Sequence, residues 1–500
     1  MTIRNLGKVL QLHYLALLII LGLAYYIAFI PHQNYPYPLH VDEWVHMARA
    51  EALMKTGNVI FADPFSGGLM GLGENLEASF QLFWGVFQTI SGISWVTIFR
   101  FFPGVVFIIT VLSVYVLAQR EGFGLEAAFF TLLIPSTVGV LGPAFLVPVS
   151  LGLLFTPLIL FLALNFRNVW SYLLIFAFIC FLLAIHAPSA IYPIIVLAPY
   201  ILLNLKGNFK RSLWLVLALV LPFLVIFPWI FSMLLPTAKS LFVKQTLTEY
   251  IQLPRVIQTY GYLPVLLGLL GAFTLAIKGG RKNYGLALGL LALLLMLVAY
   301  YSFHYGVPIV YERGLMYMML MLSIIAGAGL AAIKNLRLPE RLEIFVRMPA
   351  ITQNIGKALC LALAAIILGV TIPHRLATPY YHMIDEKDYK AFEWIRDNLD
   401  ENYGKAILDP WKATAFTAIT GKTVFTRIHV APLAKDNLTY NFIKAGSSNT
   451  TFLKDNGISI VYTRLYDGNR DKNFEFASPN PDLEIVGGDL YLLKLNSINE

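Results

Sequence analysis

The chain has 500 residues, of which 58% are hydrophobic and only 13% are charged, and its net charge is +8. Soluble domains average about 25% charged residues, so this composition excludes an ordinary soluble protein and indicates a membrane protein. Residues 1–372 carry 22 Lys and Arg against 12 Asp and Glu, whereas residues 373–500 carry 15 against 17. The excess positive charge therefore belongs to the loops between membrane spans and does not indicate a nucleic acid partner.

Long apolar runs of roughly 17–24 residues recur through the first three quarters of the chain. A helix rises about 1.5 Å per residue, so about 20 apolar residues cross the hydrocarbon core of a bilayer. Because backbone groups in lipid must pair within their own segment, these runs are expected to be helices. The pattern predicts a polytopic α-helical membrane protein with about eleven transmembrane helices. We expect them near 9–31, 95–118, 123–140, 144–164, 169–186, 188–205, 212–235, 261–278, 284–303, 314–333 and 357–373.

The basic residues of alternate loops predict the orientation. One set of loops holds fifteen Lys and Arg and the other set holds seven. The positive-inside rule places the richer set, and with it the N-terminus, in the cytoplasm. An odd number of spans then places residues 374–500 outside. Since no retention signal is seen, we expect a multi-pass protein of the cell membrane with an extracytoplasmic C-terminal domain.

Two regions outside the spans are less apolar and show patterns typical of soluble structure. The first outer loop, 32–94, contains a predicted amphipathic helix near 42–56. The tail, 374–500, combines a polar helix at 386–399 with short apolar runs at 406–408, 458–462, 483–486 and 490–495, which predicts a small α/β domain.

Acidic residues gather in the first outer loop. Asp42 and Glu43 lie about ten residues past the first span, at the start of the predicted helix. A carboxylate this close to the bilayer is expected to have a partner or a function. Carboxylates are also the ligands that Mg²⁺ and Mn²⁺ prefer. The other acids on the outer side are Glu51, Asp63, Glu74, Glu77, Glu249 and Glu312.

Cations and histidines are expected at the same membrane level. His186 ends one span, and His304 and Arg313 flank the outer ends of two later spans. A bidentate Arg with nearby donors suits a lipid phosphate or diphosphate. Structural alternatives stay open, because His186 can form an interhelical hydrogen bond and Arg313 can pair with Glu312 or with lipid headgroups.

The stretch Asp42-Glu43-Trp44-Val45-His46-Met47-Ala48-Arg49, followed by Gly57 and by Asp63-Pro64-Phe65, resembles the first outer loop of the oligosaccharyltransferase catalytic subunit. That family belongs to the GT-C class of polyprenyl-phosphate-dependent glycosyltransferases. Thr246-Leu247-Thr248-Glu249 is similar to the family's hydroxyl-x-x-Glu motif, and Arg313 to its donor-phosphate Arg. Leu408-Asp409-Pro410-Trp411, followed by a helix and Gly421, resembles the motif that reads the acceptor.

The resemblance implies a transmembrane glycosyltransferase-like domain at 1–373 and an extracytoplasmic α/β domain at 374–500. An acceptor group would displace a polyprenyl phosphate or diphosphate from a sugar or glycan on the outer membrane face. The acceptor would be a protein, a glycan or a lipid. The implied roles are catalysis by Asp42 and Glu43, donor-phosphate binding by Arg313, His186 and His304, divalent metal (Mg or Mn) binding by Asp42 and Glu249, and acceptor-side contacts by His46, Asp63, Asp409 and Trp411.

The sequence departs from the family in two places. The family carries a second acidic pair in the outer loop between spans three and four, but residues 138–148 contain no acid. The tail lacks the complete tryptophan/aspartate motif. These departures weaken the specific expectation of asparagine-linked transfer and leave two alternatives open. One is a transporter or flippase of a lipid-linked substrate, although such proteins usually place charges near the bilayer midplane. The other is a non-catalytic relative.

Overall fold

The computed structural model describes residues 3–71, 75, 77–137, 140–240, 243–244, 258, 260–336, 349–378, 380, 382–428, 433–466, 482–487 and 489–494. The chain divides into two compact units. The helical unit contains residues 1–33 and 101–380, and the loop–tail unit contains residues 34–100 and 381–500. Most of the first outer loop therefore shares a unit with the tail. The expected division into separate domains after residue 373 stays a prediction.

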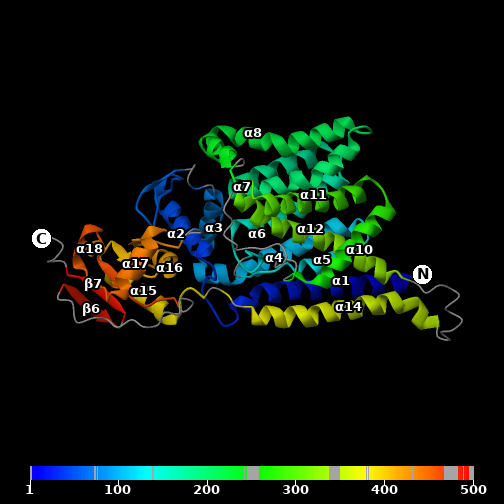
Figure 1. Cartoon of the computed structure of the whole chain (residues 1–500). Coiled ribbons are helices and arrows are strands. Elements are labelled where there is room, and N and C mark those ends of the chain that lie inside the picture. Colours follow the sequence, from blue (N-terminus) through cyan, green and yellow to red (C-terminus); the bar gives the residue numbers. More distant parts are fainter. Residues whose placement is uncertain are drawn as a thin grey trace. The chain divides into compact units, whose positions relative to one another are not determined.

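Among the described residues, eight helices are long and apolar enough to cross a membrane. The expected class, a polytopic helical membrane protein with a small α/β region, is confirmed (Figure 1). The long apolar helices are α1 (Ile3–Phe29, which continues as η1, Ile30–His32), α4 (Trp95–Gln119), α6 (Pro148–Asn165), α7 (Val169–Asn204), α8 (Phe209–Ser240), α11 (Arg281–Phe303), α12 (Pro308–Lys334) and α14 (Pro349–Ala377).

The difference between eight such helices and about eleven expected spans has three sources. Helix α10 (Tyr262–Lys278) is apolar but has only 17 residues, so it is not among these eight long helices. Helix α7 is counted once, although its backbone leaves the helical conformation at His186 (φ −160°, ψ 92°). The third source is the span expected at 123–140, in which only α5 (Gly124–Thr131) is helical.

Contacts at the ends of α7 show that it folds back on itself at His186. Arg211, at the start of α8, donates from Nη2 to the carbonyl of Ala163, shortly before α7 begins, at 2.8 Å. Its guanidinium carbon also lies 5.4 Å from the centre of the Tyr200 ring, close to the end of α7. Both ends of α7 therefore lie at one end of the helical unit. The spans expected at 169–186 and 188–205 correspond to the two halves of this hairpin.

The span predicted at 123–140 is wrong as a continuous helix. Pro135 interrupts the apolar run, and proline breaks a helix because it lacks the backbone N–H and clashes with the preceding turn. The irregular backbone after α5 is buried, and the Leu133 carbonyl accepts a hydrogen bond from Arg375 Nη2 at 2.7 Å. Non-helical backbone at membrane depth is tolerated when protein surrounds it in this way.

Helix α12 is the most enclosed span of the helical unit, with 83% of its apolar window buried. It packs closely on α10 because both helices carry glycines at the contact. A Cβ on Gly271 would lie 1.8 Å from the Ile325 carbonyl oxygen, and one on Gly329 would lie 2.1 Å from that of Leu267. Small residues at such contacts let helix backbones approach, which is how membrane helices gain van der Waals contact.

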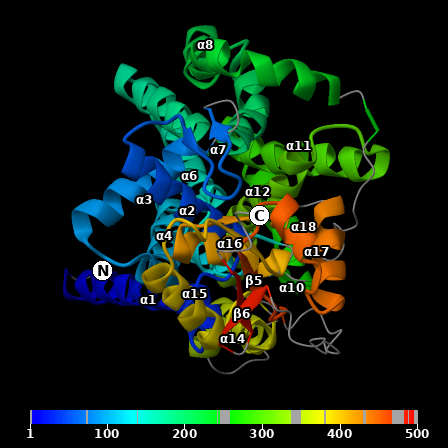
Figure 2. The ribbon, with the colours of Figure 1, turned by 90° about the vertical axis from the view of Figure 1, so that its left-hand side faces the viewer.

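The loop–tail unit contains a five-stranded sheet in the order β4-β3-β5-β7-β6. Strand β3 (Lys405–Ile407) runs parallel to β4 (Thr423–Val424) and β5 (Ile460–Tyr462), and β7 (Leu490–Leu493) runs antiparallel to β5 and β6 (Leu483–Gly487). Helices cover both faces (Figure 2). On one face Phe392 of α15 (Glu386–Asn398) contacts Phe416 of α16 (Pro410–Thr420) and Tyr462. On the other face, residues of α17 (Ala434–Lys444) and α18 (Thr450–Asp455) join the core around Ile407 and Val461.

The rest of the loop–tail unit comes from the first outer loop. The amphipathic helix expected at 42–56 is present as α2 (Val41–Thr56), which packs against α3 (Ala78–Ser91) and α16. A short hairpin of β1 (Phe61–Ala62) and β2 (Leu69–Met70) follows α2. The amide of Val424 in β4 donates to the carbonyl of Phe65 in this hairpin at 3.0 Å. The tail domain thus holds the loop that carries the predicted catalytic acids.

Candidate functional site

The start of α2 is fixed by a capping box. His40 is the N-cap residue, and Glu43 reaches back so that its carboxylate accepts from the amides of Leu39 (2.8 Å) and His40 (3.1 Å). Glu43 is fully buried by these contacts. Its visible role is to satisfy backbone donors at the helix start. A catalytic role for Glu43 stays a prediction.

Asp42 lies beside this cap and is partly exposed. Its carboxylate oxygen Oδ2 lies 3.5 Å from His40 Nδ1, and 42% of its side chain is exposed. The Asp42 amide donates to the same His40 nitrogen at 3.1 Å, so in the neutral ring the proton lies on Nε2. Asp42 is therefore anchored at its backbone while its carboxylate is accessible to a substrate.

One face of α2 carries a row of ionisable groups, because residues four and seven positions after Asp42 lie on the same side of a helix. His46 is buried, its Nε2 lies 3.9 Å from Glu77 Oε2, and its ring meets Phe80 edge-on at 4.8 Å. Burial lowers the pKa of His46 to about 4, although the charge of Asp42 opposes this shift. His46 is thus neutral near pH 7, so its approach to Glu77 is not an ion pair.

Arg49 continues the row and approaches Asp63. Arg49 Nε lies 3.8 Å from Asp63 Oδ1, and both side chains are mostly buried. The other Asp63 oxygen accepts from the amide (3.2 Å) and the hydroxyl (2.8 Å) of Ser66, which fixes the turn between β1 and β2. The Asp63 carboxylate thus orients the turn with one oxygen and attracts Arg49 with the other.

Arg427 enters this cluster from the tail and was missed by the sequence analysis. It follows β4, and its guanidinium lies 4.9 Å from the centre of the Phe65 ring. Burial and the like charge of Arg49 lower its pKa, while Asp63 and Asp42 act in the opposite sense. Arg427 makes neither a hydrogen bond nor an ion pair with any residue that the structure describes. No local signal marks this arginine in the sequence, because only the fold of the tail brings it to α2.

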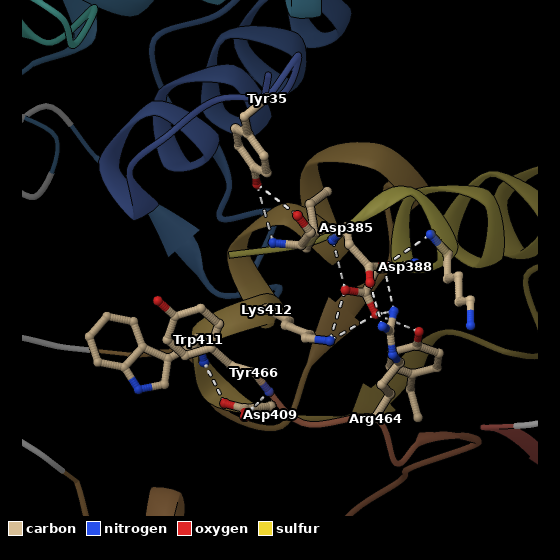
Figure 3. Close-up of polar contacts among 11 residues, drawn as sticks. Tyr35, Asp385, Asp388, Asp409, Trp411, Lys412, Arg464 and Tyr466 are labelled. Carbon is tan, nitrogen blue, oxygen red and sulfur yellow. Dashed lines mark hydrogen bonds and ion pairs between the residues drawn. The ribbon is translucent and has the colours of Figure 1, made fainter. Parts of the chain in front are cut away.

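The acceptor-side candidates of the tail lie at the start of α16 (Figure 3). Asp409 is buried and accepts from the Trp411 amide (3.0 Å), the Tyr440 hydroxyl (3.1 Å) and the Tyr466 amide (2.8 Å). Burial raises the pKa of Asp409, although these three hydrogen bonds oppose the shift. The Trp411 ring lies 5.7 Å from that of Tyr466. Asp409 therefore acts as a helix cap, and an acceptor-side role for it and Trp411 stays a prediction.

A pocket of about 700 Å³ lies nearby in the same unit, and paired charges form part of its lining. Lys412 donates to both oxygens of Asp388 at 2.8 Å, and both side chains are almost completely buried. Arg464 binds both oxygens of Asp385 and also reaches Asp388 at 3.1 Å (Figure 3). The hydrogen bonds from Arg464 hold the pKa of Asp385 well below its usual range. These groups neutralise one another, so they stabilise the tail rather than leave a free charge for a ligand.

One donor-phosphate candidate of the helical unit is hydrogen-bonded, through Ser189, to the helix that carries another. At the tip of the α7 hairpin, His186 Nδ1 lies 2.6 Å from the Ser189 hydroxyl, which accepts a hydrogen bond from Tyr317 on α12, also at 2.6 Å. Arg313 lies four residues before Tyr317 on α12, so both are on one helix face. The hydrogen-bonded chain therefore runs from His186 to the helix face that carries Arg313. His304 occupies the turn before α12 with left-handed backbone (φ 64°).

The expected metal site is not complete in the described residues, which contain no group of three or more His, Cys, Asp and Glu side chains suited to a metal ion. Asp42 supplies one accessible carboxylate. Its expected partner Glu249 lies outside the described residues. A divalent metal therefore stays a prediction.

Comparisons with known proteins agree on the fold. No family model and no curated sequence matches the chain. Many solved structures do, among them the following three. An apo oligosaccharyltransferase from Archaeoglobus fulgidus has a TM-score of 0.58 and 14% identity over 89% of this chain and 69% of its own. ArnT from Cupriavidus metallidurans, bound to undecaprenyl phosphate, has a TM-score of 0.57 and 13% sequence identity, and the match covers 98% of this chain and 99% of ArnT. The mycobacterial arabinofuranosyltransferase AftD has a TM-score of 0.56 and 16% sequence identity, and the match covers 90% of this chain and 35% of AftD.

The fold implied by the first outer loop is thus confirmed over most of the chain. All three structures are GT-C glycosyltransferases, and the similarity to ArnT spans nearly the full length of both proteins. The chain is a multi-pass membrane protein with the GT-C fold, similar in structure to the oligosaccharyltransferase catalytic subunit.

Proposed function

We propose that the protein is a membrane glycosyltransferase that moves a sugar or glycan from a polyprenyl phosphate or diphosphate to an acceptor on the outer membrane face. The fold supports this class of reaction. ArnT was solved with undecaprenyl phosphate, and an archaeal oligosaccharyltransferase with dolichol-phosphate and an inhibitory peptide. By analogy, the donor is lipid-linked, and the acceptor is a protein, a glycan or another lipid. The proposed orientation places the N-terminus in the cytoplasm and the tail outside.

The observation that carries the proposal is the accessible Asp42 carboxylate at the head of the ionisable face of α2. In the proposed reaction, Asp42 accepts the proton of the acceptor's nucleophilic group. The freed electron pair attacks the anomeric carbon, and the bond from that carbon to the phosphate oxygen breaks. The polyprenyl phosphate leaves with the bonding pair, and Arg313 stabilises its charge through hydrogen bonds. His46, neutral at pH 7, contributes hydrogen bonding rather than charge.

The test compares Asp42→Asn with Glu51→Gln in membranes supplied with a radiolabelled polyprenyl-phosphate sugar. Glu51 is a second, partly buried carboxylate of α2, so it controls for loss of an acid from the same helix. We expect Asp42→Asn to lower transfer at least a hundredfold at normal protein level, because general bases contribute about 10² to 10⁴ in rate. The Glu51 variant should keep most activity. Normal transfer by Asp42→Asn would remove Asp42 from the mechanism, and solute flux without transfer would favour a transporter.

A further inference from the structure

A groove of about 570 Å³ lies between the first half of α7 and the beginning of α8, entirely within the helical unit. Three cations line it, Arg167, Lys210 and Arg211, and the lining contains no acidic side chain. The remaining lining is mostly apolar and follows the two helices as far as Phe176 and Leu221. The groove is therefore amphipathic along its length.

The cations lie together at the end of the helical unit where α7 begins. Arg167 immediately precedes the α7 cap residue Asn168, and Lys210 and Arg211 are in the first turn of α8. Arg211 is held by its hydrogen bond to the Ala163 carbonyl, and its Nε has no hydrogen-bond partner in the described part of the chain. Arg167 and Lys210 are exposed and form no ion pair with any described acid.

Two other basic residues at this end are paired with an acid. Lys278 and Lys282 lie 3.5 Å and 3.8 Å from the two carboxylate oxygens of Glu121. Lys282 also donates to Asn165 Oδ1, at the end of α6, at 2.9 Å. Among the described residues, the cations at the mouth of the groove thus lack the carboxylate partner that Lys278 and Lys282 have.

The apolar wall has the length of a lipid chain segment. Phe176 lies nine positions after Arg167 and Leu221 lies eleven positions after Lys210, which is about 14–17 Å at 1.5 Å per residue. Trp214, which is 49% exposed, lies one turn further along α8 than the cations, and aromatic rings are enriched at membrane interfaces. A ligand that matches the groove carries a negative group at one end and hydrocarbon at the other.

We propose that this groove binds an anionic phospholipid. The headgroup phosphate lies among Arg167, Lys210 and Arg211, and one acyl chain lies against Phe176 and Leu221. Basic pockets between membrane helices are a known form of site for acidic headgroups. The lipid is not the sugar donor, because the hairpin places His186, a donor-phosphate candidate, at the far end of α7's first half, about 25 Å away along the helix. The inference does not depend on the proposed transferase activity.

Native mass spectrometry of the purified full chain tests this proposal. The protein is titrated with dioleoylphosphatidylglycerol or with dioleoylphosphatidylcholine, and bound lipid is counted. We expect the anionic lipid to be retained preferentially. Arg167→Gln/Lys210→Gln should weaken its binding about thirtyfold, because each cation near a lipid surface contributes about fivefold. The charge-matched control Lys278→Gln/Lys282→Gln removes two cations from the same end of the unit and should keep the preference.

Competition identifies the occupant. Glycerol 3-phosphate should not displace the bound phosphatidylglycerol at equal concentration, because it lacks the chains. Equal retention of both lipids by the unmodified protein, or an unchanged preference in the Arg167/Lys210 variant, would overturn the proposal. Displacement by glycerol 3-phosphate would assign the cations to a free phosphate instead. Displacement by undecaprenyl phosphate at lower concentration would assign the groove to the donor.

Discussion

The hydrogen-bonded chain from His186 to Tyr317 predicts an unusual sensitivity to one methyl group. Gly152 of α6 faces the bond between Ser189 and Tyr317. A Cβ at this position would lie 2.0 Å from the Tyr317 hydroxyl oxygen and 2.3 Å from Ser189 Oγ, far inside van der Waals contact. Gly152→Ala must therefore move both groups and break at least one buried hydrogen bond.

The expected cost follows from two contributions. Overpacking a filled site costs about 1–3 kcal/mol, and leaving a buried hydroxyl without its partner costs about 1–3 kcal/mol. Alanine is favoured over glycine in a helix by about 1 kcal/mol, which offsets part of this. We expect Gly152→Ala to destabilise the protein by about 1–5 kcal/mol and to weaken binding of a polyprenyl-phosphate donor, since the Ser189 hydroxyl orients His186.

The assay is thermal unfolding of the detergent-solubilised chain, with donor-lipid binding measured in parallel. Gly369→Ala is the matched control, because Gly369 is on α14 and a Cβ there meets nothing within 4 Å. Tyr317→Phe removes the clashing oxygen, so the double variant with Gly152→Ala should lose less stability than the sum of the single variants. The reasoning is refuted if Gly152→Ala unfolds at the same temperature as Gly369→Ala, or if the two single effects simply add.

Three further predictions concern the loop–tail unit. Burial lowers the pKa of His46 from 6.5 to about 4 in the folded protein. The neutral side chain therefore costs no stability above pH 6.5, but about 3 kcal/mol of the free energy of unfolding is lost as the pH falls toward 4, because the unfolded chain binds the proton more tightly. His46→Gln should flatten the curve of unfolding free energy against pH between those values. Lys412→Met should cost about 3 kcal/mol because it removes the fully buried cation of Asp388 and leaves Arg464 as the remaining one, whereas Asp388→Leu/Lys412→Met should cost less; equal losses in denaturant unfolding would contradict this. Arg427→Gln should lower glycan transfer about tenfold, the equivalent of about 1.4 kcal/mol, because its charge acts on Asp42; Lys435→Gln, which removes a different cation of the tail, should leave transfer unchanged.

The sequence predicted the elements whose cause is local. Apolar length was sufficient for most spans, and the helix at 42–56 followed from its own pattern and ends at Gly57, which adopts the left-handed conformation (φ 60°). The α7 hairpin was also predictable, because the apolar run is too long for one span and is interrupted at His186 and Pro188. The segment at 123–140 was predicted wrongly as one helix, since hydropathy alone does not reveal that neighbouring helices bury irregular backbone there.

The candidate site was only partly accessible from sequence for the same reason. Asp42 and the neighbouring acids could be found because they cluster in one loop. The capping role of Glu43 depends on hydrogen bonds to Leu39 and His40 that a sequence pattern only suggests. Arg427 could not be found at all, because its approach to Phe65 depends on the pairing of strand β4 with its neighbours.

The construction of the loop–tail unit has a consequence for biosynthesis. The Tyr35 hydroxyl donates to the Ile384 carbonyl at 2.8 Å, a contact between residues 349 positions apart (Figure 3). A ribosome that has translated the first outer loop must therefore produce nearly all of the spans before the strands and helices that complete its surroundings exist. Until then, the surface of α2 that α16 covers in the folded protein remains open to solvent. Contacts between residues this distant in sequence form late. Interrupting translation before residue 384 would leave a set of inserted helices whose Asp42 has no finished environment.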